Sequence, residues 1–164
     1  MERIQVKDGN GSVRKPRSWS KSLYSRAVEF HGHGGPFMVV GLRMGLLALR
    51  ALDSPGWFDL SCRASLRSSP PDSCVVDGLQ TSTGCTMGKR NITVEEGEGV
   101  TSEFKFGGRV LRVSLKPDIL SMIRADLASD HGTKAEDAHQ EGSIMEKLIK
   151  ARDETLFSIN ELES

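Results

Sequence analysis

The sequence predicts an α+β fold, in which helices and strands occupy separate runs of the chain. A long helix is indicated at 37–52, because these residues are apolar almost all round and follow Pro36, which suits a first helical turn. A β-hairpin is indicated at 100–115, where two alternating segments are joined by the pair Gly107-Gly108. No internal repeat or low-complexity run interrupts the chain.

The remaining elements follow from apolar periodicity and from turn residues. Helices are expected at 19–30, at about 72–82 and at 117–127, and strands at 60–66 and 91–95. The end of the chain is expected to form an amphipathic helix, because its apolar residues repeat at helical spacing. These residues are Ile144, Met145, Leu148, Ile149 and Ala151, continued by Leu156, Ile159 and Leu162.

The composition excludes several classes of protein. The chain has 164 residues, enough for one domain, and its 22 basic side chains balance 22 acidic ones. This balance argues against a strongly basic nucleic-acid-binding protein and against acidic disorder. The longest apolar stretch is interrupted by Arg43 and Arg50, so it is too charged to cross a membrane. Three cysteines and the absence of a signal-peptide pattern predict a cytoplasmic location.

The charges are unevenly distributed, and this suggests three regions. Residues 1–29 carry seven basic and three acidic side chains, whereas residues 134–164 carry four basic and eight acidic ones. We therefore expect a flexible basic arm at 1–17, a domain at 18–128 and an acidic, helical tail at 129–164. The tail is a candidate docking segment for a partner protein or a second copy, or an ordinary helix packed on its own domain.

Three short segments concentrate reactive side chains next to glycines. They are His31-Gly32-His33-Gly34-Gly35-Pro36, then Cys74-Val75-Val76-Asp77, then Gly84-Cys85-Thr86-Met87-Gly88-Lys89. Imidazole and thiolate groups together form a ligand set that suits zinc, and three protein ligands would leave a position open for water or substrate.

Each segment also has a plain structural interpretation. A single cysteine is usually a small buried side chain, and Cys62 is expected to be one. The histidines could cap a helix, and Asp77 could simply favour the start of one. The glycine-containing segment could be a loop or an anion-binding turn, but it lacks the spacing of a Walker phosphate loop.

The three segments, in this order and spacing, resemble the FmdE family, which is named after a component of formylmethanofuran dehydrogenase. The resemblance runs from about residue 20 to 128 and rests on these stretches: Phe30-His31-Gly32-His33, Gly41-Leu42-Arg43-Met44-Gly45, Cys74-Val75-Val76-Asp77-Gly78-Leu79-Gln80 and Ser82 to Ile92. It implies helices packed on one face of a mixed sheet, as in the catalytic domain of glyceraldehyde-phosphate dehydrogenases, and often a homodimer. It also implies metal binding, usually of zinc, and a link to one-carbon or metallopterin metabolism.

The chain departs from the family at one position. The usual loop reads H-x-H-x-C-P-G, but here Gly35 replaces the cysteine and Phe37 replaces the last glycine. One expected thiolate is therefore missing, so a zinc ion would have an open position, bind more weakly or be absent. The resemblance leaves four candidate metal ligands: His31, His33, Cys74 and Cys85.

Three functional hypotheses follow. The first is a metal-binding accessory or stand-alone factor, with Asp77 as proton acceptor or as the group that orients a ligand. Lys89, Arg43 and Thr86 are then candidate contacts for an anionic ligand. The second is a metal-free assembly module that uses residues 134–164. The third is a cysteine-based enzyme, with Cys85 as nucleophile and His31 or His33 as base.

Overall fold

The computed structural model describes residues 7–129 and 141–163, and it contains a five-stranded mixed sheet in the order β2-β1-β3-β4-β5. The strands are β1 (Ser61–Leu66), β2 (Ile92–Glu96), β3 (Thr101–Phe106), β4 (Arg109–Leu115) and β5 (Phe157–Leu162). β1 and β2 are parallel, and every other neighbouring pair is antiparallel. The predicted α+β fold and the mixed sheet are confirmed.

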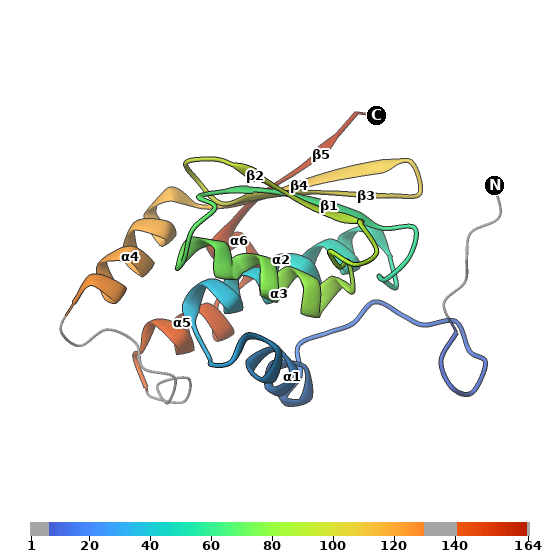
Figure 1. The fold of residues 1–164 in the computed structure, drawn as a ribbon, viewed down its shortest axis with the longest axis horizontal. Coiled ribbons are helices and arrows are strands. Elements are labelled where there is room, and N and C mark those ends of the chain that lie inside the picture. Colours follow the sequence, from blue (N-terminus) through green and yellow to red (C-terminus); the bar gives the residue numbers. More distant parts are fainter. Residues whose placement is uncertain (1–6, 130–140, 164) are drawn as a thin grey trace.

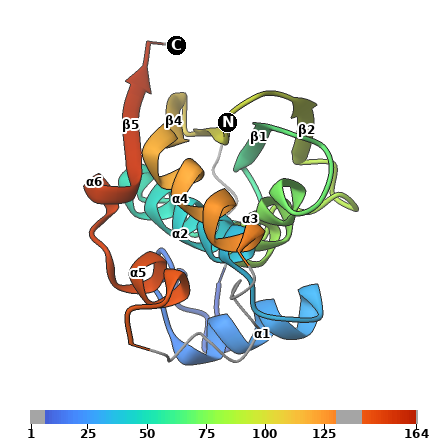
Figure 2. The same ribbon diagram turned by 90° about the vertical axis from the view of Figure 1, so that its left-hand side faces the viewer.

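Helices cover one face of this sheet. They are α1 (Lys21–His31), α2 (Pro36–Leu52), α3 (Val75–Thr83, preceded by the 3-10 turn Asp72–Cys74), α4 (Pro117–Ala128), α5 (Ile144–Lys150) and α6 (Asp153–Leu156). α2 and α3 lie directly against the sheet, whereas α1 and α5 lie on their far side (Figures 1 and 2). This arrangement explains why α2 is apolar almost all round, since it is covered both by the sheet and by other helices.

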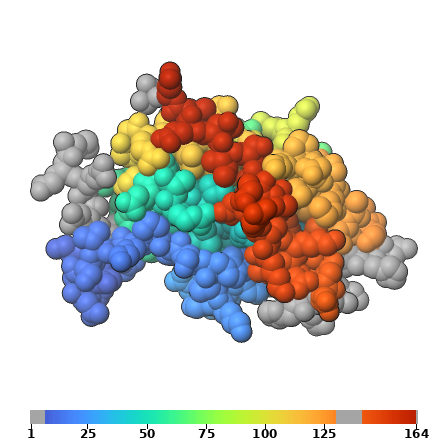
Figure 3. Space-filling model, turned by 180° about the vertical axis from the view of Figure 1, so that it is seen from behind, coloured from blue at the N-terminus to red at the C-terminus, as the bar shows by residue number. Residues whose placement is uncertain are grey.

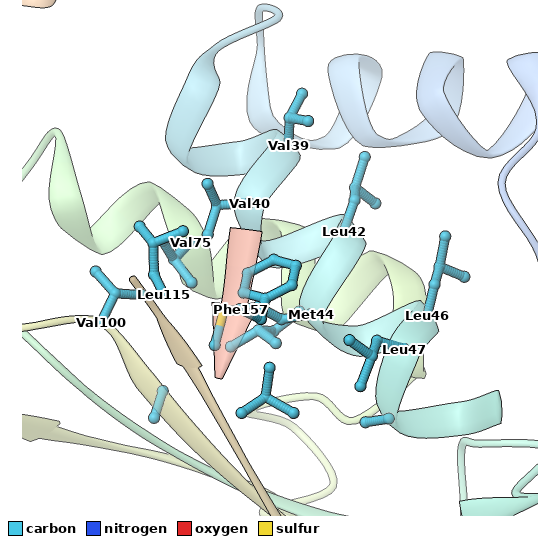
Figure 4. Close-up of a cluster of buried hydrophobic side chains, with 14 of the residues drawn as sticks. Val39, Val40, Leu42, Met44, Leu46, Leu47, Val75, Val100, Leu115 and Phe157 are labelled. Carbon is cyan, nitrogen blue, oxygen red and sulfur yellow. The ribbon is translucent and has the colours of Figure 1, made fainter. Parts of the chain in front are cut away.

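One hydrophobic core joins the sheet to the helices. Buried side chains of α2 meet Val75 of α3, Leu115 of β4 and Phe157 of β5 in a single cluster (Figure 4). The inward positions of β1, Cys62, Ala64 and Leu66, alternate with exposed or half-buried ones. Cys62 is thus a small buried side chain, as expected.

The prediction of a continuous helix to the end of the chain is wrong. α5 is short, and residues 157–162 form β5, which pairs antiparallel with β4 from Phe157 opposite Leu115 to Leu162 opposite Val110. Leu156 and Phe157 are buried in the common core, and this C-terminal segment runs across the back of the molecule along α2 (Figure 3). Residues 130–140 of the predicted tail lie outside the described residues.

The N-terminal segment makes specific contacts with the rest of the molecule. Lys7 and Val13 form an isolated antiparallel bridge, and Arg17 Nη1 donates to the carbonyl oxygen of Thr81 at 3.2 Å. The guanidinium groups of Arg14 and Arg17 lie over the ring of Trp57, 4.6 and 3.9 Å from its centroid. Arg14 and Arg17 therefore attach the end of this segment to the domain, whereas the Lys7–Val13 bridge lies within the segment itself. Residues 1–6 of the predicted arm lie outside the described residues.

Within the described ranges, none of the helices has both the length and the apolar character needed to cross a bilayer.

Candidate functional site

The end of α1 is turned toward the start of α3. α1 ends at His31 because Gly32 adopts a left-handed conformation, with φ of 99°, and its N–H donates to Val28 O at 2.7 Å. Asp77 lies in the first turn of α3, where a carboxylate is favoured by the helix dipole. The two side chains meet although they are 46 positions apart in the chain.

His31 and Asp77 form a short hydrogen bond. His31 Nδ1 lies 2.5 Å from Asp77 Oδ2, and the His31 side chain is only 10% exposed, against 34% for Asp77. A carboxylate beside one ring nitrogen favours the tautomer in which that nitrogen carries the proton. The arrangement therefore leaves a lone pair on the other ring nitrogen, Nε2.

The Nε2 atom of His31 is buried and has no hydrogen-bond partner in the described part of the chain. The exposed imidazole of His33 lies against the same ring, with the two centroids 4.7 Å apart, and its own Nδ1 lies 2.9 Å from Gly34 O. A Cβ atom at Gly35 would lie 3.2 Å from His33 Cε1. Position 35, where the resemblance implies a cysteine, thus lies beside His33.

Cys74 lies near Asp77 and is half-buried. Burial raises the pKa of its thiol, and the charge of Asp77 raises it further. The raised pKa leaves less of the Cys74 thiol as thiolate at neutral pH, so it is a weaker nucleophile than an ordinary cysteine.

Cys85 lies beyond the opposite end of α3 and is completely buried. Its thiol contacts the carbonyl oxygen of Leu60 at 3.5 Å rather than a histidine. Burial is the main cause that raises the pKa of Cys85, and a hydrogen bond with Thr83 opposes it only in part. The structure does not bring the Cys85 thiol to His31 or His33, the bases that the sequence pattern suggested for it.

The four candidate metal ligands do not converge on one point. Among residues 7–129 and 141–163, no three histidine, cysteine, aspartate or glutamate side chains are placed to hold one ion. His31, His33 and Cys74 lie near the start of α3, and Cys85 lies past its end. This placement does not fit a zinc ion held by the predicted set, so zinc binding stays a prediction.

Arg43, a candidate ligand contact, lies in α2, and its guanidinium is occupied within the protein. It donates to three backbone carbonyls at the end of α5, those of Leu148, Ile149 and Ala151, at 2.6 to 2.8 Å. It also forms an ion pair with Asp153 at 3.0 Å. Arg43 therefore fastens α5 to α2, since these carbonyls have no partner within their own helix.

Lys89 and Thr86, the other candidate ligand contacts, belong to the turn after α3. Lys89 Nζ donates to Gly84 O at 2.5 Å and to Thr86 Oγ1 at 3.0 Å. Both residues line a cavity of about 320 Å³. Its other lining residues are Arg17, Arg26, Phe30, Trp57, Gln80, Thr81 and Gly84.

Sequence reasoning missed Arg17, Arg26 and Trp57 as members of a site. The excess of basic residues in 1–29 was the available signal, but it could not show which of them fold back onto the domain. Trp57 follows Gly56 in a segment with no recognisable motif.

A family model and a solved structure point to the same family. The family model FmdE, described as "molybdenum formylmethanofuran dehydrogenase operon", matches residues 30–158. A probable S-adenosyl-L-methionine-binding protein of Archaeoglobus fulgidus is 35% identical over 78 residues, which cover 47% of this chain and 21% of that protein. This chain thus spans about a fifth of the length of that relative.

A solved structure shows the same fold. The crystal structure of an FmdE-like protein from Syntrophus aciditrophicus, named for its likeness to a component of tungsten formylmethanofuran dehydrogenase, matches with a TM-score of 0.60 and 18% sequence identity. The match covers 93% of this chain and 77% of that one.

Proposed function

This chain belongs to the FmdE family, and on that premise we propose that it is a small-molecule-binding protein whose reactive group is the His31–Asp77 pair. We further propose an accessory or stand-alone role in one-carbon metabolism. The family's description, which refers to a formylmethanofuran dehydrogenase operon, supports this setting.

The observation that carries the proposal is the state of the His31 ring. One nitrogen is bound to a carboxylate, and the other is buried without a partner among the described residues. A buried polar atom that lacks a hydrogen bond costs free energy, so its presence in a folded protein calls for a functional explanation. A ligand that donates a hydrogen bond to Nε2 would supply that explanation.

The geometry of the pair also supports a role in proton transfer. Asp77 holds the imidazole in one tautomer and stabilises the positive charge that develops when Nε2 takes up a proton. His31 would thus accept a proton from a bound ligand, and His33, which is exposed beside it, would contact the same ligand. The relative named as a probable S-adenosyl-L-methionine-binding protein supports a small-molecule ligand.

Nitrogen NMR of the histidine rings tests the pair directly. We expect His31 to carry its proton on Nδ1 in the wild-type protein and to become a mixture of tautomers in Asp77→Ala, because the carboxylate is then missing. Asp118→Ala is the matched control, since Asp118 also lies in the first turn of a helix but is exposed on α4. A wild-type ring protonated on Nε2 would contradict the proposal.

Ligand binding is then followed on the same ring signals. We expect S-adenosyl-L-methionine, or another small metabolite from a panel that includes formate, to shift the His31 resonances in the wild type but to bind weakly to His31→Gln. If every compound in the panel leaves the His31 and His33 signals unchanged, a small-molecule role for this pair is wrong.

A metal-binding role is the second candidate, and the same ring favours it. Metal-ligating histidines usually donate their other ring N–H to a carboxylate, as His31 can to Asp77. The ion would need further ligands, because no three suitable side chains of the described residues converge on one point. Zinc analysis of protein purified without a metal-affinity tag separates the two candidates. A full equivalent of zinc that is lost in His31→Gln but kept in Cys85→Ser would favour the metal.

A further inference from the structure

The cavity next to α1 and α3 is lined by cations and by aromatic rings. Arg26 and Phe30 come from α1, Arg17 from the N-terminal segment, and Lys89 from the turn after α3. Trp57 forms another part of the wall. None of the described residues that line the cavity is an aspartate or a glutamate.

Arg17 is the most unusual of these cations. Its Nη1 donates to Thr81 O, but its Nε and Nη2 atoms are buried and have no hydrogen-bond partner among the described residues. Burial, together with the charges of Arg26 and Arg14, lowers the pKa of Arg17 to about 10. A buried guanidinium with unused N–H groups and cationic neighbours is stabilised by any anion that reaches it.

Several other arginines of the molecule pair with carboxylates. On the sheet, Glu103 lies between Arg63 and Arg112, with oxygen–nitrogen distances of 2.5 and 2.6 Å. On α2, Arg43 pairs with Asp153. By contrast, neither Arg17 nor Arg26 pairs with a carboxylate in the described part of the chain. The positive charge at the cavity is therefore uncompensated there.

The far wall of the cavity is a fixed turn. Thr86 N donates to Asn91 Oδ1 at 2.9 Å, Met87 N donates to Gln80 Oε1 at 3.0 Å, and Lys89 N donates to Thr86 Oγ1 at 3.3 Å. These bonds fix the turn, and the Lys89 ammonium is held on it by its own bonds to Gly84 O and Thr86 Oγ1. A preorganised cation loses little conformational entropy when it binds an anion.

We propose that this cavity binds a phosphorylated small molecule, with the phosphate between Arg17, Arg26 and Lys89 and an apolar body against Phe30. Three cations suit a phosphate better than a carboxylate, because a phosphate carries a charge of about −1.5 to −2 at neutral pH and offers three acceptor oxygens. Arginine matches these oxygens with two parallel N–H groups.

The size of the cavity favours a small molecule over a macromolecule. A volume of about 320 Å³ exceeds the need of one phosphate and lies at the lower end of typical ligand pockets. Phe30, which is 60% exposed, provides an apolar surface at the same place. This site is separate from the His31–Asp77 pair, since neither of those residues lines the cavity, and the inference does not depend on the proposed function.

Calorimetric titration of the full chain with three probes tests the proposal at one fixed salt concentration. Phenyl phosphate and benzoate share a ring and differ in the acid group, whereas inorganic phosphate lacks the ring. We expect phenyl phosphate to bind most tightly. If benzoate binds as tightly as phenyl phosphate, the assignment of a phosphate is wrong. If inorganic phosphate binds as tightly as phenyl phosphate, the ligand has no apolar part that contacts Phe30.

Variants locate the site. Arg26→Gln and Lys89→Gln remove exposed cations, and we expect each to weaken phenyl phosphate binding about tenfold or more, the effect of one lost charge-assisted hydrogen bond. Arg67→Gln is the matched control, because Arg67 is exposed and does not line the cavity. Unchanged affinity in both cavity variants, or an equal loss in Arg67→Gln, would overturn the proposal, as would failure of the wild type to bind phenyl phosphate.

Discussion

Glycines at the contact between α2 and α3 set how closely these helices approach. A Cβ atom on Gly78 would lie 2.1 Å from Met38 O, and one on Gly41 would lie 2.0 Å from Val75 O. Both distances are far below van der Waals contact, and the obstacle is backbone, which cannot swing aside as a side chain can. Because α3 carries Asp77 next to Gly78, this close approach also places the candidate site.

We predict that Gly78→Ala lowers the free energy of unfolding by about 2 kcal/mol or more, since overpacking forces the two helices apart. Gly99→Ala is the matched control, because a Cβ at Gly99 meets nothing within 4 Å. Denaturant titration of both variants measures the difference. Equal stability of the two variants would show that the helices separate at little cost.

Individual site residues were only partly predictable from the sequence. His31, His33 and Asp77 stood out because reactive side chains lay beside glycines, but the pairing of His31 with Asp77 depends on how α1 packs against α3. Local patterns carry no information on such distant contacts. Arg17 was missed for the same reason, since its partner Thr81 is 64 positions away.

At the scale of elements, one carboxylate ties three strands together. Glu103 of β3 accepts from Arg63 of β1 and from Arg112 of β4, and these two arginines hold the pKa of Glu103 below its usual range. The bonds lie on the face of the sheet away from the core, where Glu103 is only 9% exposed. These cross-strand ion pairs favour the observed register of β1, β3 and β4 on the face of the sheet that has no apolar core.

We predict that Glu103→Gln lowers the free energy of unfolding by about 1 kcal/mol at neutral pH, the range of partly exposed ion pairs. A lowered folded-state pKa stabilises the protein above the ordinary glutamate value of about 4.3, and this contribution is lost as the pH falls through the folded-state pKa. The gap between wild type and variant should therefore be widest at neutral pH and close in acid. Denaturant titrations over a pH series measure it. A gap that stays constant into acid would rule out this ionisation as its source.

Helices and strands differed in how well the sequence predicted them. The first three helices, α4 and the strands β1 to β4 were predicted within a few residues, because capping residues, prolines and a glycine pair mark their ends. β5 was predicted as a helix because Leu156, Ile159 and Leu162 repeat every three residues. β5 is an edge strand whose side chains are largely exposed. Its sequence therefore lacks the alternation of apolar and polar residues that would have indicated a strand.

At the scale of the whole molecule, the C-terminal segment, residues 141–163, belongs to the same core as residues 18–129. Phe157 is 2% exposed and begins β5, which pairs with β4. Arg43 and Arg50 of α2 both bind Asp153, just before this strand. The segment thus contributes to the same sheet and the same core as the first half of the chain, and both should unfold together.

We therefore predict that Phe157→Ala lowers the free energy of unfolding of the whole protein by about 3–5 kcal/mol, the cost of removing a buried phenylalanine side chain. Ile159→Ala is the matched control, because Ile159 lies two positions further along the same strand but is 43% exposed. Trp19 lies beside residues 149–154, whereas Trp57 packs against Arg14 and Arg17. In a Trp19→Phe background, the fluorescence of Trp57 therefore reports on the rest of the molecule. In Phe157→Ala the fluorescence and circular dichroism transitions should move together to lower denaturant concentration. A fluorescence transition that stays at the wild-type midpoint would mean that the C-terminal segment unfolds as a unit of its own.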